Sequence, residues 1–149
     1  MTDAEKLIPQ ISKIISDNFP NSSKLVRFNT RFLNSVEIDF VLGTKKEWAN
    51  GIIQNAPLSF HAFIYNFDNE GNAIKDKYSF EPAYCRLTIK STNPMYAYQS
   101  IKIPTRKGKG DEKQLINSIN KFFKNMKKIV VDNKHLMTDE HQKAYKKFF

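Results

Sequence analysis

Residues 26–40 read VRFNTRFLNSVEIDF, and this stretch decides the expected fold. Apolar and polar side chains alternate along it, first from Val26 to Phe32 and again from Val36 to Phe40. A period of two is typical of a β-strand that buries one face and exposes the other. The two runs are separated by residues 33–35, so we predict an antiparallel hairpin with a three-residue loop.

The same alternation favours one register for this hairpin. A loop over residues 33–35 sets Phe28 opposite Phe40, which keeps the apolar side chains together. It also sets Asn29 opposite Asp39 on the polar face. A slip by one residue would place apolar side chains opposite carboxylates, and we therefore expect the first register.

The segments on either side of the hairpin continue the mixed pattern. Apolar side chains recur every three or four residues in the predicted helices, which cover about residues 3–18, 44–56, 111–132 and 138–149. Further strands are predicted over residues 58–67, 77–80, 84–90 and 96–103. The sequence therefore predicts an α+β fold, in which an antiparallel sheet of about five strands is flanked by an N-terminal helix, a short middle helix and two C-terminal helices.

Length and composition predict a cytoplasmic protein. The 149 residues are 40% hydrophobic, which suits one folded domain over residues 1–149, with a basic helical part from about residue 105. Cys85 is the single cysteine of the sequence, so no intramolecular disulfide is expected. Residues 1–6 lack the pattern of a signal peptide, and no apolar run reaches the roughly 18 residues that span a bilayer.

The positive charge is concentrated at one end of the sequence. Lysine and arginine outnumber aspartate and glutamate by 24 to 15, for a net charge of +9. Residues 101–149 alone hold thirteen basic and five acidic side chains. A field of this kind attracts polyanions or acidic protein surfaces. Solubility is the alternative explanation of the charge. We expect a polyanionic partner, such as RNA or DNA, or an acidic protein surface.

Two sets of side chains are candidates for contact with this partner. The first set is seven basic side chains on the connector before the long C-terminal helix and late in that helix, which suit a phosphate backbone: Arg106, Lys107, Lys109, Lys121, Lys124, Lys127 and Lys128. The second set mixes aromatic rings with cations on the last predicted hairpin, as base stacking requires: Tyr84, Arg86, Lys90, Tyr96 and Tyr98. Packing of the tyrosines beneath the flanking helices is the alternative for the second set.

Catalytic signatures are weaker than binding signatures. Glu37 and Asp39 form a carboxylate pair of the kind that metal-dependent nucleases use, although cross-strand charge pairing explains it as well. The three histidines match no common metal-ligand spacing, and Cys85 alternates with apolar residues as a buried side chain does. Residues 108–110 lack the spacing of a phosphate-binding loop and indicate a flexible linker. We expect no enzyme activity, cofactor, metal site or small-molecule substrate.

Residues 11–55 resemble a known family. An amphipathic helix ends in Asn18-Phe19-Pro20, the hairpin follows, and a second helix contains Trp48. This order resembles a small α+β domain associated with the large polyvalent proteins of phages and conjugative elements. Members tend to carry a tryptophan and then Gly-Pro after the hairpin, where this chain has residues 40–44, FVLGT.

The resemblance implies a non-enzymatic accessory role during genome entry and in counter-defence. Combined with the basic end, the resemblance favours a protein of a phage or mobile element that acts in a bacterial host cell. Such a protein would inhibit a host nucleoprotein defence system, as anti-CRISPR proteins do, by binding the effector protein or its guide RNA. The alternative is an accessory domain that binds DNA or RNA directly.

Overall fold

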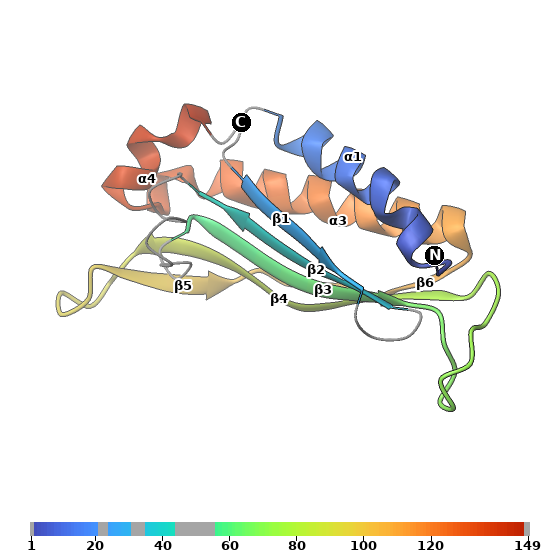
Figure 1. Cartoon of the computed structure of the whole chain (residues 1–149). Helices are drawn as coiled ribbons and strands as arrows, with labels where there is room; N and C mark the ends of the chain where they lie inside the picture. Colours follow the sequence, from blue (N-terminus) through green and yellow to red (C-terminus); the bar gives the residue numbers. More distant parts are fainter. Residues whose placement is uncertain (1, 21–23, 31–34, 44–55, 148–149) are drawn as a thin grey trace.

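A computed structural model describes residues 2–20, 24–30, 35–43 and 56–147. The fold is α+β, as the sequence predicts, and its centre is a six-stranded antiparallel sheet. Strands β1 to β5 lie side by side in chain order, and β6 pairs with the part of β4 that β5 leaves free (Figure 1). The predicted middle helix falls on residues 44–55, outside the described residues.

The described elements have the following bounds. The strands are β1 Lys24–Asn29, β2 Ser35–Leu42, β3 Leu58–Tyr65, β4 Tyr78–Lys90, β5 Tyr98–Lys102 and β6 Gly108–Gly110. The helices are η1 Glu5–Leu7, α1 Ile8–Asn18, α3 Glu112–Asp132, η3 Lys134–Leu136, α4 Asp139–Lys143 and η4 Tyr145–Lys147. Among these helices, none is long and apolar enough to cross a membrane.

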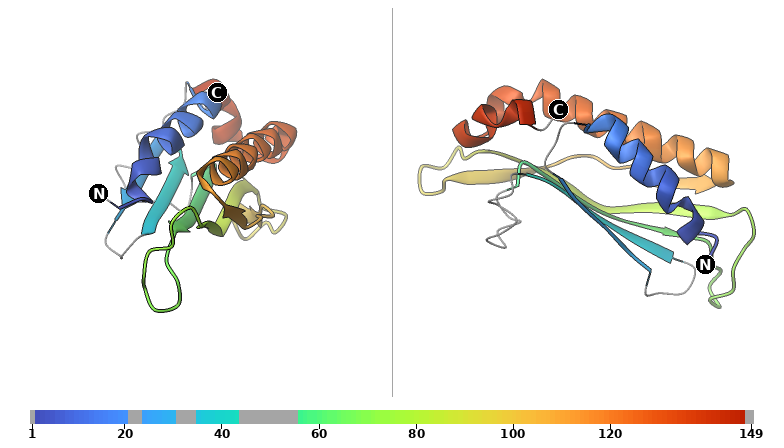
Figure 2. Two further views of the ribbon diagram at one scale, coloured as in Figure 1. Left: turned by 90° about the vertical axis from the view of Figure 1, so that its right-hand side faces the viewer. Right: turned by 45° about the horizontal axis from the view of Figure 1, so that its top comes forward.

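Helices α1 and α3 lie next to each other over one face of the sheet (Figures 1 and 2). Alternate strand residues point toward them, and the buried stripe of α3 completes the core. Phe60 of β3 is fully buried, with ring centroids 4.8 Å from Phe122 and 5.4 Å from Phe123 of α3. The ring centroid of Phe40 on β2 lies 6.0 Å from that of Phe123. An aromatic cluster therefore fixes α3 on the sheet.

The predicted hairpin forms, but its register is wrong by two residues. Asn29 lies opposite Glu37, and Asp39 lies opposite Arg27. Ser35, which the prediction placed in the loop, is the first residue of β2, and the rest of the predicted loop lies outside the described residues. A shift of two residues leaves every side chain on its predicted face, so hydrophobic alternation cannot distinguish the two registers.

Strand β4 is continuous where the sequence predicted two strands. It runs through Pro82, and its register against β3 shifts between His61 and Ala62. Proline is tolerated there because Pro82 lies between residues 78–80, which pair with β6, and residues 86–90, which pair with β5. The irregularity lets one long strand accommodate the proline.

Helix α3 follows its prediction closely. Asp111 is its N-cap, and its side chain accepts a hydrogen bond from the Gln114 backbone N–H at 2.9 Å. The Gln114 side chain accepts in return from the Asp111 backbone N–H at 3.0 Å. This capping box satisfies two backbone donors that the first turn leaves free. It sets the start of α3 and thereby the face on which the lysines lie.

Candidate nucleic-acid interface

The outer face of α3 carries a row of lysines. Lys121, Lys124 and Lys128 are exposed and are spaced by three and four residues, so they lie along one side of the helix. None of the three makes an ion pair with a residue that the structure describes. We call these three residues the lysine row. Lys127, which the sequence grouped with them, is half-buried on the flank of the helix.

The segment that precedes α3 is held at both ends, which makes the predicted flexible linker wrong. At one end the Ile103 backbone N–H donates to the carbonyl oxygen of Cys85 at 2.9 Å. At the other end, residues 108–110 form β6 and pair with residues 78–80 of β4. Residues 104–107 therefore bridge two fixed points on the same strand.

Gly108 allows this segment to lie against α3. A Cβ atom at this position would come within 2.9 Å of the Ser118 Cβ, a distance that real Cβ atoms essentially never show. Glycine is therefore required by the close approach of β6 to the helix. Strand β6 could not be predicted from local sequence, because Gly-Lys-Gly has low strand propensity and the pairing is set by residues about thirty positions away.

A pocket of about 530 Å³ lies between this segment and α3. Residues 104–107 supply one wall and residues 118–125 of the helix supply the other; its lining is Pro104, Arg106, Lys107, Ser118, Lys121, Phe122 and Asn125. We call it the basic pocket. Lys121 belongs both to the pocket and to the lysine row, so the two basic segments that are separate in sequence form one continuous surface.

The cations of the basic pocket differ in their surroundings. The Lys107 Nζ lies 3.7 Å from an oxygen of Glu81, and both side chains are substantially exposed. Arg106 and Lys121 are exposed and make no ion pair with the described residues. Lys109 is exposed on β6 and does not line the pocket. Arg106 and Lys121 are therefore the cations of the pocket for which no carboxylate of the described residues competes with an anion.

The second predicted set is only partly brought together. The Arg86 guanidinium lies over the Tyr84 ring at 4.7 Å, and both line a depression of about 330 Å³ with Ser100 and Lys102. The other three lie elsewhere on the β4–β5 hairpin. Lys90 lies opposite Tyr98 in the register, and its Nζ forms an ion pair with Asp139 at 3.0 Å. The Tyr96 side chain is 66% exposed and lies before β5. Strand β5 covers Tyr98–Lys102 and is therefore shorter than the predicted strand over 96–103.

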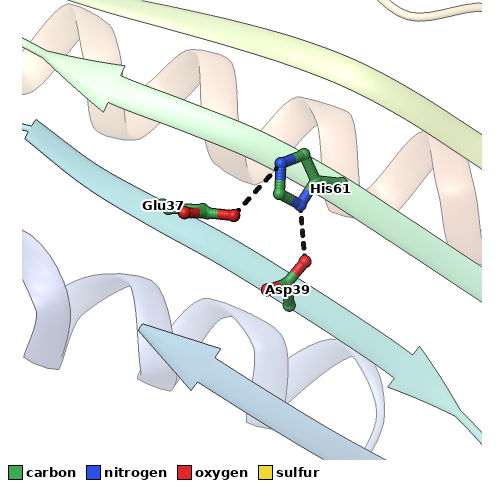
Figure 3. A group of neighbouring side chains, drawn as sticks. All are labelled: Glu37, Asp39 and His61. Atoms are coloured by element: carbon green, nitrogen blue, oxygen red, sulfur yellow. Dashed lines mark hydrogen bonds and ion pairs between the residues drawn. The ribbon is translucent and has the colours of Figure 1, made fainter. Parts of the chain in front are cut away.

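A cluster that the sequence did not predict joins β2 to β3 (Figure 3). His61 lies opposite Asp39, its Nδ1 is 2.5 Å from an Asp39 oxygen, and its Nε2 is 3.4 Å from a Glu37 oxygen. Each ring nitrogen of His61 therefore faces a carboxylate of β2.

The donor atoms of this cluster lie within 4.8 Å of one another, which suits a divalent cation. The His61 ring also stacks on Tyr84, with centroids 5.6 Å apart, and this contact links the cluster to Arg86. The alternation of polar and apolar residues in the sequence could have indicated this cluster. In an antiparallel pair that alternates with period two, polar residues of neighbouring strands meet on one face.

Cys85 is fully buried, as its alternating pattern predicts. Burial raises the pKa of its thiol from 9.0 to about 12, and the thiol donates a hydrogen bond to the Met126 Sδ at 3.3 Å. A reactive thiolate needs an exposed, electropositive setting, and Cys85 has neither.

The chain matches no protein-family model, and searches of curated proteins and of solved structures return no significant match. The functional argument therefore rests on the geometry of the basic surface.

Proposed function

We propose that this protein is a non-catalytic, nucleic-acid-binding protein that contacts phosphate groups through the lysine row and the basic pocket. The observation that carries the proposal is the continuity of these two features through Lys121. They place exposed side chains of Arg106, Lys124 and Lys128 on one connected surface. Lysines arranged in this way track a phosphate backbone without reading its sequence.

The preformed shape of the surface supports this proposal. Residues 104–107 are anchored by the Ile103 hydrogen bond and by the β6 pairing, and the lysine row stands on a helix of 21 residues. Cations on rigid elements lose less conformational entropy on binding than cations on a mobile loop. We therefore expect Arg106 to contribute as much to affinity as a lysine of the row.

Binding to labelled DNA and RNA at several salt concentrations tests the proposed function. Phosphate contact predicts that the logarithm of the association constant falls linearly with the logarithm of salt concentration. Arg106→Gln and Lys124→Gln should each reduce this slope by a similar amount. A chain that binds neither DNA nor RNA at low salt would contradict the proposal.

The second candidate function is inhibition of a host nucleoprotein defence system by a phage or mobile-element protein. Its support is the placement of thirteen basic side chains in residues 101–149, which gives one end of the sequence a field that complements a nucleoprotein surface. In this proposal the basic surface docks on the effector protein or on its guide RNA and prevents target binding.

Affinity capture from host cell extract separates the two candidates. One half of the extract is treated with nuclease, and the other half is not. Direct binding to nucleic acid predicts that captured proteins disappear after nuclease treatment. Docking on an effector protein predicts that one complex survives the treatment and that its binding depends less steeply on salt.

A further inference from the structure

The floor of the basic pocket is an aromatic ring that the core holds in place. Phe122 is half-buried and lines the pocket. Its ring centroid lies 4.8 Å from that of Phe60, 5.6 Å from Phe80 and 5.6 Å from Phe123. Three aromatic neighbours restrict the orientation of the ring, and its remaining surface faces the pocket. The core therefore presents a fixed aromatic platform at a basic surface.

The rim of the pocket combines two kinds of polar group. Arg106, Lys107 and Lys121 supply positive charge, and Ser118 and Asn125 supply neutral donors and acceptors. The Ser118 hydroxyl donates to the Gln114 backbone carbonyl at 3.0 Å and keeps free lone pairs. The volume of about 530 Å³ falls within the roughly 300–1,000 Å³ that small organic ligands occupy. A base with its sugar fits this combination of charge, hydrogen-bonding groups and size.

We propose that the basic pocket receives one unpaired base of a single-stranded nucleic acid, which stacks on Phe122 while the neighbouring phosphates lie along the lysine row. This inference rests on the proposed nucleic-acid binding and specifies its ligand. A duplex cannot supply such a base without unpairing it, whereas a single strand presents its bases freely. Lys121 lines the pocket and also belongs to the lysine row, so a strand that enters the pocket can continue onto Lys124 and Lys128.

The experiment compares single-stranded DNA, single-stranded RNA and a duplex of equal length by fluorescence anisotropy. The test variant is Asn125→Trp, which fills the pocket from an exposed position and keeps every charge. The matched control is Asn117→Trp, which makes the same substitution at an exposed position of α3 outside the basic pocket. Circular dichroism and thermal unfolding confirm that both variants fold.

We expect the parent to bind single strands more tightly than the duplex. Asn125→Trp should weaken single-strand binding at least about fivefold, the equivalent of one lost stacking contact, and leave duplex binding unchanged. Asn117→Trp should bind all three ligands as the parent does. The DNA and RNA arms show whether the sugar 2′-hydroxyl contributes.

Two results would overturn the inference, and they are distinguishable. If the parent binds single strands and duplex equally, or if Asn125→Trp binds as the parent does, the pocket takes no base, while the proposed phosphate contact stands. If the parent binds none of the three ligands at low salt, the proposed function fails and the inference fails with it. Capture of a protein partner in the absence of nucleic acid would then favour the effector-docking candidate.

Discussion

Neutralising the lysine row provides the most quantitative test of the basic surface. If Arg106, Lys107, Lys121, Lys124 and Lys128 each contact one phosphate of a single strand, the slope of log affinity against log salt is about −3.5. Replacing the three lysines of the row with glutamine removes three contacts and leaves a slope of about −1.4. From about 50 to about 200 mM salt, affinity should then fall roughly 130-fold for the parent and roughly sevenfold for the variant.

The assay is fluorescence anisotropy with a labelled single-stranded oligonucleotide at four or more salt concentrations. The matched control replaces Lys6, Lys13 and Lys75 with glutamine, which removes the same three charges from the total of +9. These lysines are exposed and lie outside the row and the pocket. Surface substitutions of this kind change stability by about 0.5 kcal/mol or less each, so both variants should fold.

The reasoning fails if the row variant keeps the parent's slope. It also fails if the control variant loses as much slope as the row variant, because binding would then follow net charge and not the geometry of α3. In either case, the lysine row is not the phosphate-binding surface, and the depression formed by Tyr84 and Arg86 becomes the surface to test.

Three further predictions concern the fold and the other polar groups. Cys85→Ala should reduce the alkaline loss of stability, which urea denaturation measures. The unfolded thiol ionises above pH 9 and the folded one only near pH 12, so between neutral pH and about pH 10.5 the parent should lose about 2 kcal/mol more of its free energy of unfolding than the variant does. Asp39→Ala should lower the free energy of unfolding by about 1 kcal/mol through its lost contact with His61, whereas Asp17→Ala, at an exposed pair, should change it by less than about 0.5 kcal/mol. Gly108→Ala should destabilise by about 1–3 kcal/mol, and a double-mutant cycle with Ser118→Gly should show coupling above about 0.5 kcal/mol.

Local signals predicted the helices well and the strand pairings less well. The start of α3 at Asp111 follows from a capping box only four residues long, and its lysine row follows from helical spacing alone. Two registers of β1 against β2, which differ by two residues, place the same side chains on the apolar face, so the alternation does not choose between them. That choice is set by contacts with β3 and the helices, which no local pattern contains.

The features of the candidate site that were not predicted from the sequence also depend on pairing between residues that are distant along the chain. The basic pocket exists because β6 pairs with β4 and carries residues 104–107 past α3, yet β6 has only three residues and two of them are glycine. The cluster of Glu37, Asp39 and His61 requires the pairing of β2 with β3. Sequence patterns identified Arg106 and Lys121 as candidates, and the sheet determined that they meet.

The placement of the lysine row argues for a ligand independently of its total charge. Like charges three and four residues apart on a helix destabilise it by about 0.2–0.5 kcal/mol per pair, and Lys121–Lys124 and Lys124–Lys128 are two such pairs. Solubility requires net charge but not clustering, and lysines dispersed among acidic residues would supply it without repulsion. No carboxylate among the described residues pairs with the row to relieve this repulsion. A polyanion bound along α3 would do so, and its binding should therefore raise the melting temperature of the parent more than that of the glutamine variant.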